Sequence, residues 1–159
     1  LRVIRSKTAK LFEASARLGA ILAGAGPVME QSCSEYGRAL GTAFQLVDDL
    51  LDYDGETHEL GKNVGDDLRE GKPTMPLLVA MARGNEAERA LIRHAIEQGE
   101  VTRLPQVVAA VRRTGAIDAA RELAAAEAAT ARACAAGLPP SVFRDALLHL
   151  CARAVDRSS

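Results

Sequence analysis

A long stretch whose only helix breakers are isolated glycines runs from Pro27 to Tyr53, and it restricts the chain to folds that can hold one long helix. After the proline it reads VMEQSCSEYGRALGTAFQLVDDLLDY, with no breaker stronger than an isolated glycine. The segment before it, 11–24, has apolar residues at helical spacing and is followed by a stop at Gly26 and Pro27. Together the two segments predict a pair of consecutive helices.

The rest of the chain continues the helical pattern. Only 3% of residues are aromatic, and alanine and leucine are abundant, so helix is favoured over strand. Pro73 is expected in the first turn of the next helix, PTMPLLVAMARG, where a proline removes no intrahelical hydrogen bond. Further helices are predicted at 85–98, 101–114, 116–136 and 140–156. The sequence therefore predicts an all-α helical bundle, with residues 1–159 forming a single domain or part of one.

A narrow acidic stripe lies at the end of the long predicted helix. At 100° per residue, Gly41, Gln45, Asp48 and Asp52 fall within about 60° of one another, with Asp49 at the edge. From residue 40 onward the remaining surface of this helix is apolar, so this part is expected to be buried and its carboxylates to require neutralising cations. The alternative is a solvated acidic face, which the flanking leucines disfavour because they leave so little polar surface.

Magnesium is the cation that best fits this pattern. An EF-hand calcium loop counted from Asp52 would place Thr57 where the loop requires glycine. Mg²⁺ commonly uses one or two carboxylates and takes its other ligands from water and from substrate phosphates. The acidic stripe therefore predicts a ligand that carries phosphate.

Two lysines in the polar segment 54–72 could meet such a phosphate. Lys62 and Lys72 each follow a glycine that lets the backbone approach a ligand closely. Neither belongs to a P-loop, because the glycine spacing is wrong and no Ser or Thr follows the lysine. Either glycine–lysine pair alone is typical of a surface turn, but beside the aspartates they favour an anion site. The segment is predicted to be a long loop with a functional reason for its length.

These residues resemble a known family. The block GTAFQLVDDLLDYDGETHELGKNVGDDLREGKPTMPLL, with KTAKLFEASARLGAILAG before it, resembles the C-terminal half of the trans-polyprenyl diphosphate synthases, especially the bacterial octaprenyl-type long-chain enzymes. The likeness runs through most of the chain and is sharpest in residues 7–80. It implies the C-terminal part of an all-α isoprenoid-synthase-type fold.

The resemblance implies a Mg²⁺-dependent prenyltransferase. Such an enzyme condenses isopentenyl diphosphate with an allylic prenyl diphosphate to make a trans-polyprenyl diphosphate, here expected to be a long-chain precursor of quinone side chains. The family's second D-D-x-x-D motif is matched by Asp48, Asp49 and Asp52, which are the implied metal ligands. The residues implied to contact the allylic diphosphate or its metals are Lys7, Thr8, Gln45, Lys62 and Lys72. Catalytic roles are implied for Asp48, Asp49, Lys7 and Lys62.

Two parts of the family's active site are not found in this sequence. The first D-D-x-x-D motif and the basic residues that bind isopentenyl diphosphate lie in the family's N-terminal half. The stretch DDLRE at 66–70 is no substitute, because the family carries it in the lysine loop. The chain is therefore expected to hold about half of an active site, with the missing N-terminal half and a second copy in a homodimer as partners.

Two other functions fit parts of the pattern. A terpene cyclase is one, since Glu56 follows the acidic motif at a spacing like that of a cyclase metal motif, although the lysine loop favours elongation. The other is a non-catalytic or split subunit of a heteromeric prenyl synthase, whose partner would supply the missing motif. A complete reading frame that carries a D-D-x-x-D upstream of Leu1 would decide between one chain and two.

Charge and cysteine content describe the setting. The formal net charge of −1 provides no field that would attract nucleic acid. The three cysteines, Cys33, Cys134 and Cys151, form no C-x-x-C pair, and a reducing cytoplasm is the simplest expectation. No apolar run approaches the roughly 20 residues that a transmembrane helix needs.

Overall fold

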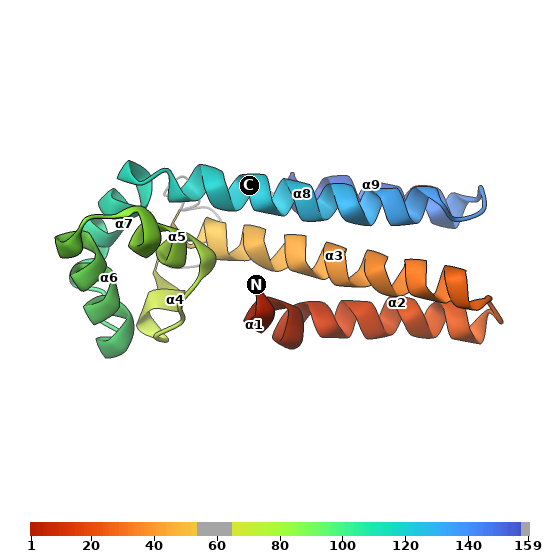
Figure 1. Ribbon diagram of the computed structural model, residues 1–159, viewed down its shortest axis with the longest axis horizontal. Helices are drawn as coiled ribbons and strands as arrows, with labels where there is room; N and C mark the ends of the chain where they lie inside the picture. Colours follow the sequence, from red (N-terminus) through yellow and green to blue (C-terminus); the bar gives the residue numbers. More distant parts are fainter. Residues whose placement is uncertain (54–64, 157–159) are drawn as a thin grey trace. The chain divides into compact units, whose positions relative to one another are not determined.

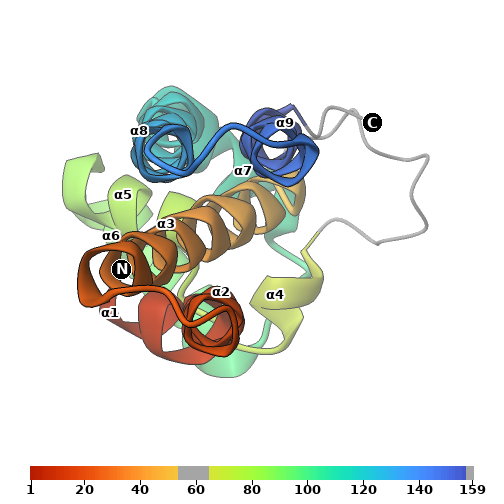
Figure 2. The same cartoon turned by 90° about the vertical axis from the view of Figure 1, so that its right-hand side faces the viewer.

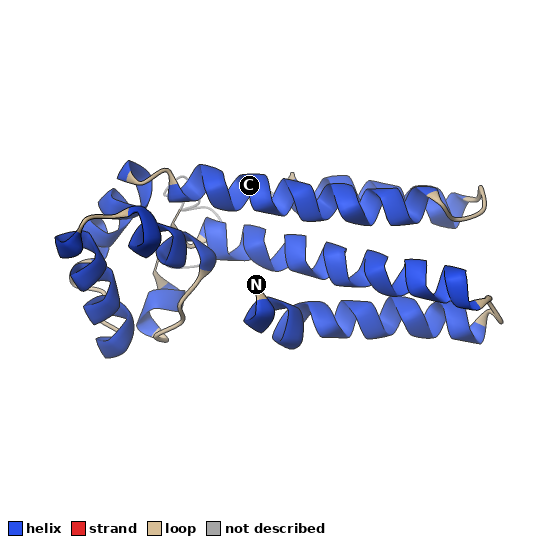
Figure 3. Cartoon of the chain, in the orientation of Figure 1, coloured by secondary structure: helices blue, strands red, loops and turns tan. Residues whose placement is uncertain are grey.

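The computed structural model describes residues 1–53 and 65–156. Within these two ranges every regular element is helical (Figures 1 and 3), which confirms the all-α prediction. No helix in the same ranges is long and apolar enough to span a membrane. Lys62, predicted to contact the allylic diphosphate, lies outside the described residues.

The helices follow the predicted ranges, and the expected ends differ from the observed ones by at most three residues. In chain order the elements are α1 (Arg2–Ile4), the π-helix η1 (Arg5–Ala9), α2 (Lys10–Leu22), α3 (Pro27–Leu51), α4 (Asp66–Arg69), α5 (Met75–Arg83), α6 (Glu86–Gln98), α7 (Leu104–Arg113), α8 (Ala116–Ala136) and α9 (Val142–Val155). The chain ahead of the first predicted helix is thus helical as well.

Two local expectations were wrong. The helix expected from Pro73 begins at Met75, so the proline in its first turn is Pro76. The segment expected to be a loop contains the short helix α4, which buries Leu68 completely. Leu68 is the apolar anchor that stabilises this turn of helix within an otherwise charged sequence.

The chain divides into two compact units. The first unit combines Leu1–Val47 with most of α8 and with α9, and the second spans Asp48–Glu122. Helix α3 therefore contributes Gln45 to the first unit and the acidic motif to the second. That residues 1–159 act as a single domain remains a prediction.

In the first unit, α3 lies between α2 on one side and the pair α8 and α9 on the other (Figures 1 and 2). The Tyr36 hydroxyl donates a hydrogen bond of 3.1 Å to the Leu147 carbonyl of α9. The buried core here is Tyr36, Ala39, Leu40, Ala131, Ala135, Cys151 and Ala154. Its small alanines let α8 approach α3 closely.

Glycines on α3 permit an equally close approach of α2. A Cβ atom at Gly37 would lie 2.3 Å from the Phe12 carbonyl oxygen, and one at Gly41 would lie 2.8 Å from the Cα atom of Ala9. Gly37 and Gly41 are one helical turn apart and therefore lie on the same face of α3. The backbone of residues 9–12 packs directly against that face.

Gly37→Ala should destabilise the first unit. The added methyl group meets backbone atoms of α2, so the helices must separate, and overpacking of this kind costs about 1–3 kcal/mol. The matched control is Gly19→Ala on α2, where a Cβ atom meets nothing within 4 Å. The free energy of unfolding of Gly19→Ala should rise by about 0.5–1 kcal/mol, because alanine has the higher helix propensity. Urea unfolding of both variants measures the difference, and equal stabilities would contradict the close packing.

The second unit is built on α5, α6 and α7. Leu77, Ile92, Val107 and Val111 are fully buried at its centre, and Tyr53 joins the same core. Helix α6 is well terminated: the Asn85 side chain and Glu88 form a reciprocal capping box, and Gly99 ends the helix in the left-handed conformation with φ of 60°. This core supports the segment that follows the acidic motif.

Candidate functional site

The acidic motif lies at the carboxyl end of α3. Because α3 ends at Leu51, Asp48 and Asp49 belong to its last turn and Asp52 lies just beyond it, where the sequence predicted helix up to Tyr53. Asp49 and Asp52 are only 5% and 7% exposed. Their burial contradicts a solvated acidic face, and the negative end of the helix dipole makes partners for them more necessary still.

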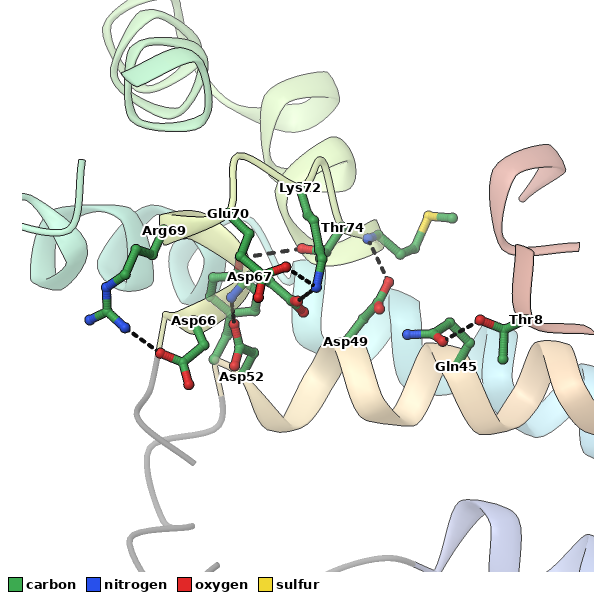
Figure 4. Close-up of polar contacts among 12 residues, drawn as sticks. Thr8, Gln45, Asp49, Asp52, Asp66, Asp67, Arg69, Glu70, Lys72 and Thr74 are labelled. Carbon is green, nitrogen blue, oxygen red and sulfur yellow. Dashed lines mark hydrogen bonds and ion pairs between the residues drawn. The ribbon is translucent and has the colours of Figure 1, made fainter. Parts of the chain in front are cut away.

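Main-chain N–H groups supply those partners (Figure 4). The Asp67 N–H donates to Oδ2 of Asp52 at 2.9 Å, and the Met75 N–H donates to Oδ2 of Asp49 at 3.3 Å. Both donors lie in the first turn of a helix, α4 or α5, where N–H groups have no intrahelical acceptor. Carboxylates and helix starts therefore satisfy one another.

Lys72 lies in the chain between Asp67 and Met75, the two residues that donate these hydrogen bonds, and its ammonium group is held by acidic side chains (Figure 4). Its Nζ atom is 2.7 Å from Glu70 Oε2 and 2.9 Å from Asp67 Oδ1. The hydrogen bonds to Glu70 and Asp67 raise the pKa of Lys72 above its ordinary value. The ammonium group is thus charged at neutral pH, and 43% of the side chain is exposed.

A buried hydrogen bond between two hydroxyl groups, those of Thr74 and Tyr53, also joins the lysine segment to the chain that follows α3. Tyr53 is fully buried, and the Thr74 hydroxyl donates to its phenol oxygen at 3.3 Å. Burial raises the pKa of Tyr53, so this phenol remains neutral. Sequence reasoning missed Tyr53, Asp67 and Thr74, because their roles depend on contacts across 15 and 21 residues of chain that no local pattern encodes.

The donor set of the acidic motif fits Mg²⁺. Carboxylate oxygens are the hard ligands this ion prefers, and it keeps several positions for water or phosphate. Among residues 1–53 and 65–156, no three His, Cys, Asp or Glu side chains are grouped so that they could hold a metal by themselves. An ion here would complete its coordination with other ligands.

In the first unit the structure brings together two of the predicted diphosphate residues. The Thr8 hydroxyl donates to Gln45 Oε1 at 2.7 Å (Figure 4). Thr8 and the exposed Lys7 lie on η1. Although π-helical turns are rare in proteins overall, those that do occur are often found at functional sites. An ion pair of 2.6 Å between Arg5 and Glu127 fixes η1 against α8.

Comparison with known proteins gives consistent results. The family model described as polyprenyl synthetase matches residues 1–111. Octaprenyl diphosphate synthase from Escherichia coli is 51% identical over 158 residues, which are 99% of this chain and 49% of that protein. This chain spans about half the length of the curated relatives it matches.

Solved structures agree with the sequence comparison. A decaprenyl diphosphate synthase from Rhodobacter capsulatus superposes with a TM-score of 0.89 at 44% identity, over 99% of this chain and 49% of that one. A polyprenyl synthase from Caulobacter crescentus, complexed with calcium and isoprenyl diphosphate, gives a TM-score of 0.87 at 42% identity, over 99% and 48% of the two chains. On this evidence the chain belongs to the polyprenyl synthetase family, with the all-α fold of the isoprenyl synthases.

Proposed function

We propose that this chain forms about half of a long-chain trans-polyprenyl diphosphate synthase, which condenses isopentenyl diphosphate with an allylic prenyl diphosphate. The observation that carries the proposal is the arrangement in the second unit, where the buried Asp49 and Asp52 of the D-D-x-x-D motif are hydrogen-bonded to the segment that carries the charged Lys72. A prenyl-chain product longer than the short isoprenoids is supported by the octaprenyl and decaprenyl relatives.

The reaction breaks the allylic C–O bond, and its electron pair leaves with the diphosphate. The double bond of isopentenyl diphosphate attacks the allylic carbon to form the new C–C bond, and a proton is then lost. Asp48, Asp49 and Asp52 would hold Mg²⁺, which, when bound, stabilises charge on the leaving diphosphate. Lys72 adds a fixed positive charge for the same oxygens, and such preorganised charge acts most strongly where water is excluded.

The other assignments belong to the same proposal. Lys7, Thr8, Gln45 and Lys62 contact the allylic diphosphate or its metals. The complete enzyme is a cytoplasmic homodimer whose product supplies a quinone side chain. The first acidic motif and the isopentenyl diphosphate site come from residues outside this chain.

Activity of the complete protein that contains these residues tests the proposal. With labelled isopentenyl diphosphate, an allylic primer and Mg²⁺, it should form labelled linear prenyl diphosphates. Cyclic hydrocarbons would instead indicate a terpene cyclase. Elongation that appears only after a second protein is added would indicate a split enzyme.

Mg²⁺ should bind the acidic motif only when a diphosphate is present. The described carboxylates do not form a complete cage, so phosphate oxygens are needed to complete the coordination. Calorimetric titration of Mg²⁺ into the complete protein, with and without a non-hydrolysable allylic diphosphate analogue, measures this. Micromolar binding without the analogue would contradict the expectation.

Lys72→Ala should weaken binding of an allylic diphosphate about tenfold or more, because a charge-assisted hydrogen bond contributes about 1.5–3 kcal/mol to the binding free energy. Binding of the matching uncharged prenyl alcohol should change little. Lys62→Ala should behave in the same way. Lys10→Ala is the control, because Lys10 is 65% exposed and pairs with Glu13, three residues along the chain. Equal losses for the two ligands would make Lys72 a structural residue.

A further inference from the structure

The segment that carries Lys72 is fastened to the acidic motif at both ends. Asp52 accepts the N–H of Asp67 before the lysine, and Asp49 accepts the N–H of Met75 after it. We call these two hydrogen bonds the main-chain tethers. They enclose residues 67–75, so the aspartates fix the backbone on either side of the lysine.

The first tether continues directly to the ammonium group. The residue whose N–H is bound by Asp52 is also the residue whose carboxylate holds Lys72 at 2.9 Å. Asp52, Asp67 and Lys72 therefore form one connected series (Figure 4). Because Asp52 is 7% exposed, its hydrogen bond to the main chain is sheltered from competing water.

We propose that Asp49 and Asp52 are positioning residues for Lys72: through the main-chain tethers they hold the lysine segment at the acidic motif before metal or diphosphate binds. The inference rests on the proposed function for its substrate and deepens it, since it gives two residues of the motif a task separate from metal binding. A lysine held in place in advance loses less freedom when the diphosphate arrives.

Replacement of Asp52 by asparagine or by alanine separates its role in the main-chain tether from its role as a metal ligand. The asparagine side chain keeps an oxygen that can accept the Asp67 N–H, but as a neutral amide it is a weaker Mg²⁺ ligand than a carboxylate. Alanine removes both the acceptor and the metal ligand. The difference between Asp52→Asn and Asp52→Ala therefore reports on the tether.

Hydrogen exchange at the Asp67 amide measures the tether without substrate. The complete protein is examined in EDTA, at single-amide resolution. Protection of the Asp67 amide should fall about tenfold or more in Asp52→Ala and much less in Asp52→Asn, as expected for loss of a hydrogen bond to a charged group. The Glu88 amide, which the Asn85 side chain caps at 2.9 Å in the same unit, is the internal control.

The Glu88 control shows whether Asp52→Ala has unfolded the unit. If its amide also loses protection, the Asp49→Asn and Asp49→Ala pair replaces the Asp52 variants, with the Met75 amide as the readout. Equal protection in the alanine and asparagine variants of both residues would overturn the proposal.

Kinetics then test whether the tether acts through Lys72. Asp52→Ala should raise the KM for the allylic diphosphate several-fold more than Asp52→Asn, and leave the KM for isopentenyl diphosphate unchanged. Adding Lys72→Ala to Asp52→Ala should raise the allylic KM little further, because the two changes remove one shared interaction. Fully additive effects would overturn the positioning role. A wild-type protein with no elongation activity would refute the proposed function, whereas the exchange result would still decide whether the tethers exist.

Discussion

Asp48→Ala in the complete enzyme should slow elongation about 100- to 1,000-fold, the range found when a single group that stabilises developing charge is removed. Asp48 lies on the last turn of α3 and is half-buried. The main-chain tethers use Asp49 and Asp52, so this substitution leaves both of those hydrogen bonds in place. Single-turnover elongation at saturating primer measures the loss, which should appear in the rate constant of the chemical step.

A matched control separates loss of charge at the motif from loss of charge elsewhere. Asp118 on α8 is 78% exposed and pairs with Arg121 one turn along, so Asp118→Ala should leave elongation within about twofold of the wild type, as surface ion pairs contribute little. Asp48→Asn should resemble Asp48→Ala if charge matters, because asparagine preserves the shape. An unchanged rate in Asp48→Ala would remove this residue from the metal-binding assignment.

The 159-residue chain by itself should show no prenyltransferase activity above background. In the proposed reaction, charge on the leaving diphosphate is stabilised by metal ions that two acidic motifs would hold, and the second substrate needs its own basic site. Only one such motif is found in this sequence. The chain covers 49% of its octaprenyl relative, so the remaining groups are expected in the other half. Labelled isopentenyl diphosphate, an allylic primer and Mg²⁺ provide the assay.

Self-association of the isolated chain should accompany this inactivity. Leu11, Leu18 and Leu22 follow one face of α2 at helical spacing and are 71%, 55% and 86% exposed. An apolar helix face of this kind favours burial against another surface. Sedimentation of the purified chain should show oligomers that dissociate when leucines of this face are replaced by glutamate.

Robust elongation by the isolated chain would contradict the expected inactivity and would mean that different residues complete the site.

The helices and the burial of the motif could be predicted from sequence because both depend on local periodicity. The C-terminal part of the long helix, residues 40–52, has apolar residues all around the helix except at one narrow acidic stripe. The apolar surface of such a helix must be buried against other elements, whichever elements those are. Its carboxylates were therefore expected to be desolvated, and Asp49 and Asp52 are buried as that reasoning requires.

What neutralises those carboxylates was decided by tertiary structure. Sequence reasoning assigned the task to metal ions, whereas the structure also supplies main-chain N–H groups from the starts of α4 and α5. Lys72, which sequence reasoning assigned to a phosphate, pairs with Glu70 and Asp67, its near neighbours in the sequence. These partners depend on where α4 and α5 begin, and those starts depend on the burial of Leu68 and Leu77 in the core of the second unit.

The sequence by itself thus determined the helical class, the approximate helix ends and the buried acidic motif, since side-chain periodicity and breakers act over a few residues. Only the tertiary structure decided which donors meet Asp49 and Asp52. Those donors lie 26 and 15 residues further along the chain, and every residue except proline offers the same N–H group, so no side-chain pattern can mark the one that is used.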